Sequence, residues 1–354
     1  MFIKLVFLTK FAKGIISYYK TNEMYEVMDL QIYEYDRTVP FNLKEEQLDD
    51  HVLLSFDAVY EPDVPESKRV LVHYYKAENP WMNLIFLHGI GNGHVRYLMW
   101  FGKYFAKRGI NVYFLIHPYH LERGKPEWEG GEPFFHQSPA HCVVRFHQAI
   151  KDVRRTIDLI KSSSESAKLP TSLMGFSFGG MIATMTLALD KRLNAGVLAF
   201  TGGDWRWINW YSPYLEPVRE GYAKYSNEWG CKDEELCVKL RSKSRRDVAQ
   251  LKNIDEIFTL TPSCFHYDPL SYAKFANQPV LMFQGIFDKI IPAQAYAGVY
   301  DLLPNGKKII IPSGHKSSYI FRRIIGHSCV RFFKENINRK TSEVNDEVDE
   351  LYGA

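Results

Sequence analysis

The pentapeptide Gly-Phe-Ser-Phe-Gly at residues 175–179 places Ser177 between two glycines that each lie two residues away. An apolar run at residues 171–176 precedes the serine, and a helical pattern at residues 179–190 follows it. Glycines at these positions let the chain turn sharply from strand to helix, so that the hydroxyl stands exposed above the sheet edge. Such a pentapeptide also arises by chance, so the predicted flanking strand and helix are the main evidence for a functional turn. The pattern predicts Ser177 as a nucleophile.

A serine hydroxyl is a poor nucleophile at neutral pH until a general base takes its proton, so a histidine and an orienting carboxylate should accompany it. Asp288 follows the apolar run at residues 279–284, and His315 follows the run at residues 307–311. Both residues therefore fall in loops at the carboxyl ends of predicted strands, the sheet edge that also carries Ser177. The sequence predicts Asp288 as the acid and His315 as the base.

Other residues could fill the same two roles. Asp204 follows another predicted strand and could act as the acid, while His266 or His327 could act as the base. His327 lies within a helical pattern and His266 lies within an insertion, so both are less well placed. Asp288 itself could instead cap a turn ahead of Pro292.

A glycine-rich loop at residues 88–93, reading His-Gly-Ile-Gly-Asn-Gly, follows one predicted strand and opens a helix. Backbone amides in such a loop can stabilise the oxyanion that forms when a serine attacks a carbonyl group. The expected donors are the amide of Phe178 and the amide of either Ile90 or Gly91. The loop also offers a Gly-x-Gly pattern for a dinucleotide, but the third glycine of that motif is missing.

From residue 69 onward, apolar runs of strand length alternate with helical patterns, which is typical of a mostly parallel sheet covered by helices on both faces. Strands are expected near residues 69–75, 83–88, 111–117, 171–176, 195–200, 279–284 and 307–311. Helices are expected near residues 95–108, 141–161, 179–190, 292–302 and 317–336.

Two regions fall outside this alternation. Residues 1–68 form an N-terminal extension, and residues 204–275 interrupt the strand series as a helical cap or lid inserted into a core of residues 69–203 and 276–340. The cap opens with an aromatic cluster that includes Trp205 and Trp207, which could line an acyl pocket or seat the insertion on the core. The acidic residues 341–354 are expected to form a flexible tail.

The composition excludes several classes of protein. The formal charge is only +3, from 44 basic and 41 acidic residues, so no broad field favours nucleic acid as a partner. One basic run at residues 239–246 could contact a phosphate or an anionic membrane, but it is interpreted as a solvated helix face, because no aromatic residues interleave with it. Five cysteines form no C-x-x-C pair, which favours a reducing cytoplasm over a disulfide framework or a zinc ribbon.

The N-terminal residues 1–16 are apolar but are interrupted by Lys4, Lys10 and Lys13. These lysines break the uninterrupted run that a signal peptide needs, and no run reaches the ~20 residues of a membrane span. Apolar residues recur at helical spacing beside the lysines, so the segment could form an amphipathic helix at a membrane surface. The alternative is that this helix packs on its own domain.

Residues 70–336 resemble the α/β-hydrolase superfamily. The resemblance is carried by the loop at residues 88–91, the elbow at residues 175–179, the Asp288 loop and the Gly314-His315 pair. The segment at residues 117–126 looks like a branch of esterase-like hydrolases with a Pro-Tyr-His-x-x-Arg loop. The resemblance implies an α/β-hydrolase fold and a mechanism that requires no cofactor.

Substrate contacts are expected from His88, Tyr119, Arg123, Trp205 and Trp207. Arg123 could bind an acidic group of the substrate or brace the site by pairing with Glu132, since a guanidinium and a carboxylate can pair in bidentate fashion. The alternative is an ion pair that only stabilises the loop.

A metal site is not expected. His117 and His120 form a close pair that Glu122 could join, but no third ligand stands at a familiar spacing.

Together these features predict serine-dependent hydrolysis of a small-molecule carboxylic ester through an acyl-enzyme, with short to medium acyl chains favoured by the aromatic cap. The same residues serve thioester and peptide hydrolysis, because one fold supports many acyl transfers. Two further alternatives are a lipid hydrolase at a membrane surface and a binding protein with a silent site. The sequence indicates neither the natural substrate nor the oligomeric state.

Overall fold

The structure, a computed structural model, describes residues 29–135, 139–213, 215–216, 219–220, 223 and 233–352. The chain divides between Ile32 and Tyr33 into two units, and the sheet and the site described below belong to the second unit. The amphipathic segment at residues 1–16, on which a membrane interpretation depends, lies outside the described residues, as does Cys231.

Nine strands of the described chain form one sheet in the order β1-β2-β3-β5-β4-β6-β7-β8-β9. The chain from β1 to β3 runs as an antiparallel meander, β3 pairs antiparallel with β5, and every pair from β5 through β4 to β9 is parallel. The strands are β1 (Lys44–Gln47), β2 (Val52–Asp57), β3 (Arg69–Tyr75), β4 (Met82–Leu87), β5 (Ile110–Ile116), β6 (Thr171–Phe176), β7 (Leu193–Ala199), β8 (Val280–Gly285) and β9 (Gly306–Ile311).

The mostly parallel sheet predicted from the sequence is confirmed, and each of the seven expected strands is present within two residues of its expected bounds. Two strands were not expected. β1 and β2 come from the stretch interpreted as an extension, yet they pair into the same sheet beside β3. β1 reads Lys-Glu-Glu-Gln and all four residues are exposed, so it lacks the apolar alternation that marks a strand.

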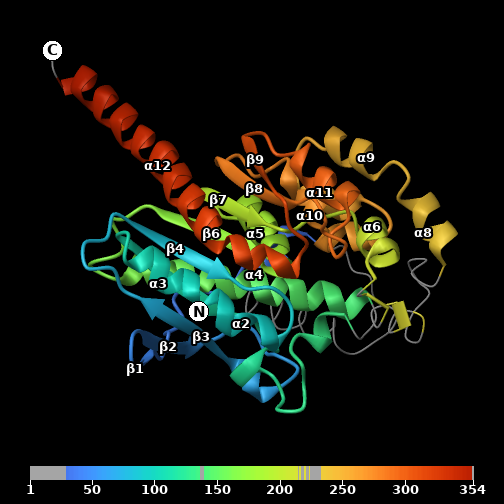
Figure 1. Cartoon of the computed structure of the whole chain (residues 1–354), viewed down its shortest axis with the longest axis horizontal. Coiled ribbons are helices and arrows are strands. Elements are labelled where there is room, and N and C mark those ends of the chain that lie inside the picture. The colour runs from blue at the N-terminus through green and yellow to red at the C-terminus, as the bar shows by residue number, and fades with distance from the viewer. Residues whose placement is uncertain are drawn as a thin grey trace, which may run out of the picture. The chain divides into compact units, whose positions relative to one another are not determined.

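The helices form two groups (Figure 1). On one face α3 and α12 contact each other, and on the other α4, α5, α10 and α11 contact in succession. The helices of the described residues are α2 (Val95–Leu98), α3 (Trp100–Ala106), α4 (Pro139–Ser162), α5 (Phe178–Leu189), α6 (Trp205–Tyr211), α8 (Glu234–Leu240), α9 (Ser244–Gln250), α10 (Pro269–Ala273), α11 (Ala293–Tyr300) and α12 (Arg322–Tyr352).

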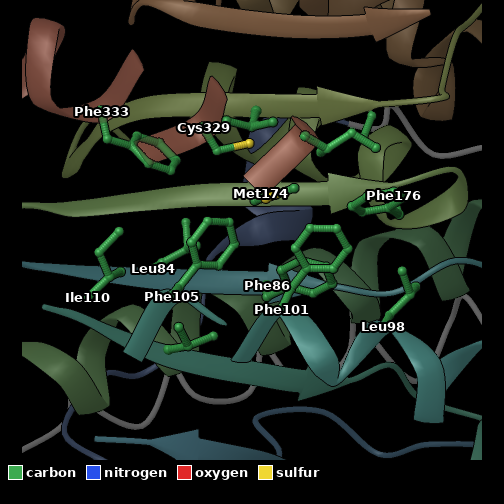
Figure 2. Packing of buried hydrophobic residues seen from close by; sticks show 14 of the residues in the cluster. Leu84, Phe86, Leu98, Phe101, Phe105, Ile110, Met174, Phe176, Cys329 and Phe333 are labelled. Carbon is green, nitrogen blue, oxygen red and sulfur yellow. The ribbon is translucent and has the colours of Figure 1, made fainter. Parts of the chain in front are cut away.

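The core beneath α3 and α12 is built from alternate residues of the central strands, because alternate side chains of a strand share one face of the sheet. Phe86 of β4 lies at its centre and stacks on Phe101 of α3 and Phe176 of β6, at ring distances of 5.6 and 5.7 Å. Figure 2 shows Phe333 and Cys329 of α12 above the same strands. Phe176 immediately precedes Ser177, so this packed layer fixes the strand end that carries the serine.

The predicted insertion lies between β7 and β8 and is helical, comprising α6, α8, α9, α10 and short 3-10 turns where the structure describes it. At the C-terminus α12 continues to Tyr352, so residues 341–352 of the expected tail are helical. That this tail is flexible stays a prediction.

Candidate active site

Ser177 occupies the turn between β6 and α5 with φ 52° and ψ −118°, a conformation that a residue other than glycine rarely adopts. The flanking glycines make this turn feasible. A Cβ on Gly179 would lie 2.5 Å from the carbonyl oxygens of Leu87 and His88, and a Cβ on Gly175 would collide with the carbonyl of Gly179. The sharp turn raises the serine above the carboxyl edge of the sheet.

Three predicted residues form one chain of hydrogen bonds at that edge. His315 Nε2 lies 2.9 Å from Ser177 Oγ, and His315 Nδ1 lies 2.8 Å from Asp288 Oδ2. Asp288 follows β8, and His315 follows β9 at the start of a 3-10 helix. The parallel strands β6, β8 and β9 thus bring together residues that lie far apart in the sequence.

The carboxylate of Asp288 fixes the tautomer of His315. Its Oδ1 accepts hydrogen bonds from the amides of Ile290 and Ile291 at 2.9 and 3.0 Å, which leaves Oδ2 to face the imidazole. A carboxylate can only accept, so Nδ1 carries the proton and Nε2 presents its lone pair to the hydroxyl of Ser177. This arrangement can remove a proton from the serine.

A pocket of about 190 Å³ opens beside Ser177 and His315. Its walls are mainly apolar, and the insertion contributes Leu215 to them. The lining residues are Gly89, Ile90, Tyr97, Leu98, Phe176, Ser177, Phe200, Leu215, Ile290, His315, Lys316, Ser318 and Tyr319. The sequence did not single out Tyr97 or Tyr319 as lining residues. Their only signal was their position just after the glycine loop and just after His315.

Of the two expected oxyanion donors in the glycine loop, the structure leaves Ile90 available. The amide of Gly91 donates to His120 Nε2 at 3.2 Å, so it is already engaged. No hydrogen bond of the described residues uses the amide of Ile90, and this residue lines the pocket with Ser177. Phe178 is the first residue of α5, where a helix leaves its amides without an internal partner.

Three residues expected to contact substrate are instead fully buried. His88 donates from Nδ1 to the carbonyl of Gly89 at 2.6 Å, and its Nε2 accepts the amide of His117 at 3.1 Å. The hydroxyl of Tyr119 donates to Gln148. These side chains do not reach the pocket, because they are occupied within the protein interior.

Arg123 is the third of these buried residues, and the pairing with Glu132 that the sequence left open is not the one present. The guanidinium lies 2.7 Å from Asp152 of α4 and also donates to the carbonyl of Ile116. Glu132 instead accepts the amides of Glu129 and Gly130. The arginine therefore braces the end of β5 rather than a substrate, in line with the loop-stabilising alternative.

Trp205 and Trp207 are also absent from the pocket walls. Trp205 is buried against Phe146 and Tyr267, with ring centroids 5.6 and 5.5 Å away. Trp207 packs on Tyr211 within α6. Through Phe146 of α4, Trp205 seats the insertion on the core, which was the alternative to an acyl-pocket lining, whereas the ring contacts of Trp207 stay within α6.

The rival acid Asp204 is buried and occupied. It accepts from Arg206 at 2.7 Å and from Arg241 at 3.1 Å, and Arg241 also pairs with Asp268. Arg241 belongs to the basic run at residues 239–246, so the expectation that this run is simply solvated was wrong for Arg241, although the other four basic residues of the run are exposed. The buried network therefore joins separate segments of the insertion to one another, at residues 204–206, 241 and 268.

The rival bases do not line the serine pocket either. His266 is buried in the insertion, with Nε2 3.3 Å from the carbonyl of Leu260, and His327 is exposed on α12.

Among the described residues, no group of three or more His, Cys, Asp or Glu side chains could hold a metal ion. No helix across the same residues combines the length and the apolar character that crossing a membrane requires.

Buried histidines predict a loss of stability in acid. Burial lowers the pKa of His147 to about 3 and that of His120 to about 4. Their pKa in the unfolded chain is about 6.5, so only the unfolded chain binds protons as the pH falls from there towards 4. The stabilisation from keeping them neutral is therefore complete above pH 6.5 and is lost as the pH approaches the folded pKa. At pH 5 the loss is about 2 kcal/mol for each histidine.

Urea unfolding at pH 7 and pH 5 measures this loss. The difference between the two free energies of unfolding should shrink by about 2 kcal/mol in His147→Leu. It should be unchanged in His327→Gln, because His327 is exposed. Equal differences in all three proteins would contradict this prediction.

Residues 78–314 match the model of the Hydrolase_4 family, described as serine aminopeptidase, S33. The chain therefore belongs to this family, which lies within the α/β-hydrolase superfamily. No curated protein sequence matches the chain.

Solved structures show the same fold. An acetyl xylan esterase from Paenibacillus sp. R4 superposes with a TM-score of 0.59 at 16% identity, over 84% of this chain and 89% of that one. An acylaminoacyl peptidase from Pyrococcus horikoshii superposes with a TM-score of 0.55 at 13% identity. The match covers 85% of this chain and 42% of the peptidase chain. A cold-adapted esterase from an Arctic intertidal metagenomic library superposes with a TM-score of 0.50 at 17% identity. The match covers 84% of this chain and 99% of the esterase chain.

Proposed function

We propose that the protein hydrolyses carboxylic esters with short to medium acyl chains through an acyl-enzyme on Ser177. The observation that carries the proposal is the continuous chain of hydrogen bonds from Ser177 through His315 to Asp288. Membership in a hydrolase family and the esterases among proteins of the same fold support it.

In the first half of the reaction, His315 Nε2 takes the proton of Ser177 as Oγ attacks the acyl carbon. The amides of Ile90 and Phe178 donate to the oxyanion. His315 then gives the proton to the leaving alcohol, and the acyl group stays on Ser177. In the second half His315 activates a water molecule, which releases the acid and restores the serine.

The size of the pocket supports the proposed acyl length. Its volume of about 190 Å³ falls below the ~300–1000 Å³ that is typical of pockets for drug-sized ligands. Its walls are apolar and include Leu98, Phe200 and Ile290, which suits an alkyl chain more than a charged group.

A series of p-nitrophenyl esters from acetate to palmitate tests the acyl preference. The value of kcat/KM is expected to peak between about four and eight carbons and to fall at least tenfold for palmitate, because the pocket cannot enclose the longer chain. The matched variant Leu98→Phe should shift the optimum to shorter acyl groups. A maximum at palmitate would contradict the proposed chain length.

Peptide hydrolysis is the second candidate, because the family model is named for an aminopeptidase. Aminoacyl p-nitroanilides measured beside the esters separate the two. Ester hydrolysis should exceed anilide hydrolysis, and a reversed ratio would favour the peptidase.

A further inference from the structure

The amide of Gly91 is held by a histidine that takes no part in the proposed proton transfers. Gly91 N–H donates to His120 Nε2 at 3.2 Å, and His120 Nδ1 lies 2.9 Å from the carbonyl oxygen of Pro118. A carbonyl can only accept, so Nδ1 carries the proton and Nε2 is free to accept from Gly91. The histidine thus links the glycine loop to the segment that follows β5.

Two further hydrogen bonds flank this link and hold the loop to the same segment. His88 Nε2 accepts the amide of His117 at 3.1 Å, and Asn92 Oδ1 accepts the amide of Leu121 at 2.7 Å. The contact of His120 lies between these two bonds. It is the contact nearest to Ile90, whose amide is available for an oxyanion.

The imidazole of His120 is kept neutral. Its side chain is fully buried, and burial, aided by the positive charge of Arg123, lowers the pKa of His120 to about 4. The lone pair on Nε2 is therefore present at neutral pH. A protonated ring would instead present an N–H to the N–H of Gly91.

The backbone on either side of His120 is strained. Tyr119 has φ 65° and Leu121 has φ 48°, in the left-handed region that residues other than glycine rarely adopt. Such conformations persist where the surrounding structure enforces them, and they cluster at functional sites. Here the two unusual residues flank the histidine whose Nε2 contacts the Gly91 amide of the glycine loop.

The packing around His120 leaves the imidazole little room to move. Gly131 has φ 89°, and a Cβ at this position would lie 2.8 Å from the ring of His120 and collide with the side chain of Ile90. The ring of His88 lies 4.9 Å from that of His120, edge to face. On the other side, a Cβ on Gly89 would lie 3.3 Å from Cβ of Ser177, so the loop touches the nucleophile directly.

We infer that His120 is a positioning residue for the reaction, holding the Gly91 amide so that the amide of Ile90 points at the oxyanion formed on Ser177. Accepting from Gly91 fixes the peptide unit that follows Ile90, and with it the orientation of the loop. It also withdraws the Gly91 amide as a competing donor. The inference rests on the proposed function and adds the residue that sets the geometry of its oxyanion site.

Two substitutions at residue 120 separate positioning from simple burial. His120→Leu fills the same space without an acceptor, whereas the carbonyl oxygen of the amide in His120→Gln can take the place of Nε2. His147→Leu is the matched control, because it removes another fully buried histidine far from the loop in sequence. Each variant is assayed with p-nitrophenyl butyrate, and its thermal unfolding is measured beside the wild type.

We expect His120→Leu to lower kcat by about 10–100-fold, somewhat less than the ~10²–10³-fold cost of deleting an oxyanion donor, with KM changed by less than about threefold. His120→Gln should stay within about fivefold of the wild-type kcat, and His147→Leu should keep it. Affinity for a butyl trifluoromethyl ketone, whose adduct carries an oxyanion, should fall in step with kcat.

The inference is overturned if folded His120→Leu keeps the wild-type kcat, or if His120→Gln loses as much activity as His120→Leu. It is also overturned if inhibitor affinity stays unchanged while kcat falls. Failure of the proposed function would look different, because the wild type would then not hydrolyse the ester, or hydrolysis would survive Ser177→Ala, whatever residue 120 contains.

Discussion

Ser177→Ala is expected to lower the kcat for ester hydrolysis by about 10⁶-fold, because no other group can form the acyl-enzyme. His315→Ala should cost nearly as much, since the serine hydroxyl then has no base at 2.9 Å to take its proton. The two losses should not add in the double variant, because both residues serve the same step. Initial rates with p-nitrophenyl butyrate measure all three variants.

The fold should survive the loss of the serine hydroxyl, because alanine keeps the Cβ and the backbone of the turn. Ser172→Ala is the matched control, since Ser172 is a buried serine on β6, the strand that leads to Ser177. It should retain wild-type activity. Hydrolysis above about one per cent in folded Ser177→Ala would mean that another nucleophile carries the reaction.

Asp288→Asn is expected to lower kcat by about 10⁴-fold although it changes almost no volume. The amides of Ile290 and Ile291 both donate to Oδ1, so the carbonyl oxygen of an asparagine must take that position. Its NH₂ group then faces His315 Nδ1, which has to accept. The proton of the imidazole therefore moves to Nε2. A protonated Nε2 has no lone pair with which to accept the proton of Ser177.

This effect is distinguishable from the loss of a negative charge alone. Asp301→Asn removes an exposed aspartate that pairs with Arg245, and it should leave kcat unchanged. The KM of Asp288→Asn should stay near that of the wild type, because the pocket walls are intact. A loss below about tenfold would show that Asp288 does not set the tautomer.

The sequence predicted the sheet and the order of Ser177, Asp288 and His315 because each of these follows an apolar run of strand length. In a parallel sheet the carboxyl ends of the strands share one edge, so residue type and position suffice to bring the three together. The hydrogen bonds of the structure connect these same residues. Their role as a catalytic unit stays a prediction until the variants are measured.

The sequence could not decide between the amides of Ile90 and Gly91, because the choice depends on a tertiary contact. His120 lies 29 residues beyond Gly91, and only its position in the fold shows that it occupies that amide. The same holds for Arg123, whose partner Asp152 lies on α4 rather than in the neighbouring loop. Side-chain partners across elements leave no local pattern in the sequence.

Labelling with a fluorophosphonate tests the central claim most directly, because the reagent bonds to a serine only where the hydroxyl is activated and its oxyanion is stabilised. Intact mass and peptide mapping should show one adduct per chain on Ser177 in the wild type and none in Ser177→Ala. An adduct on another residue, or no adduct on a folded chain that hydrolyses esters, would contradict the assignment of Ser177 as the nucleophile.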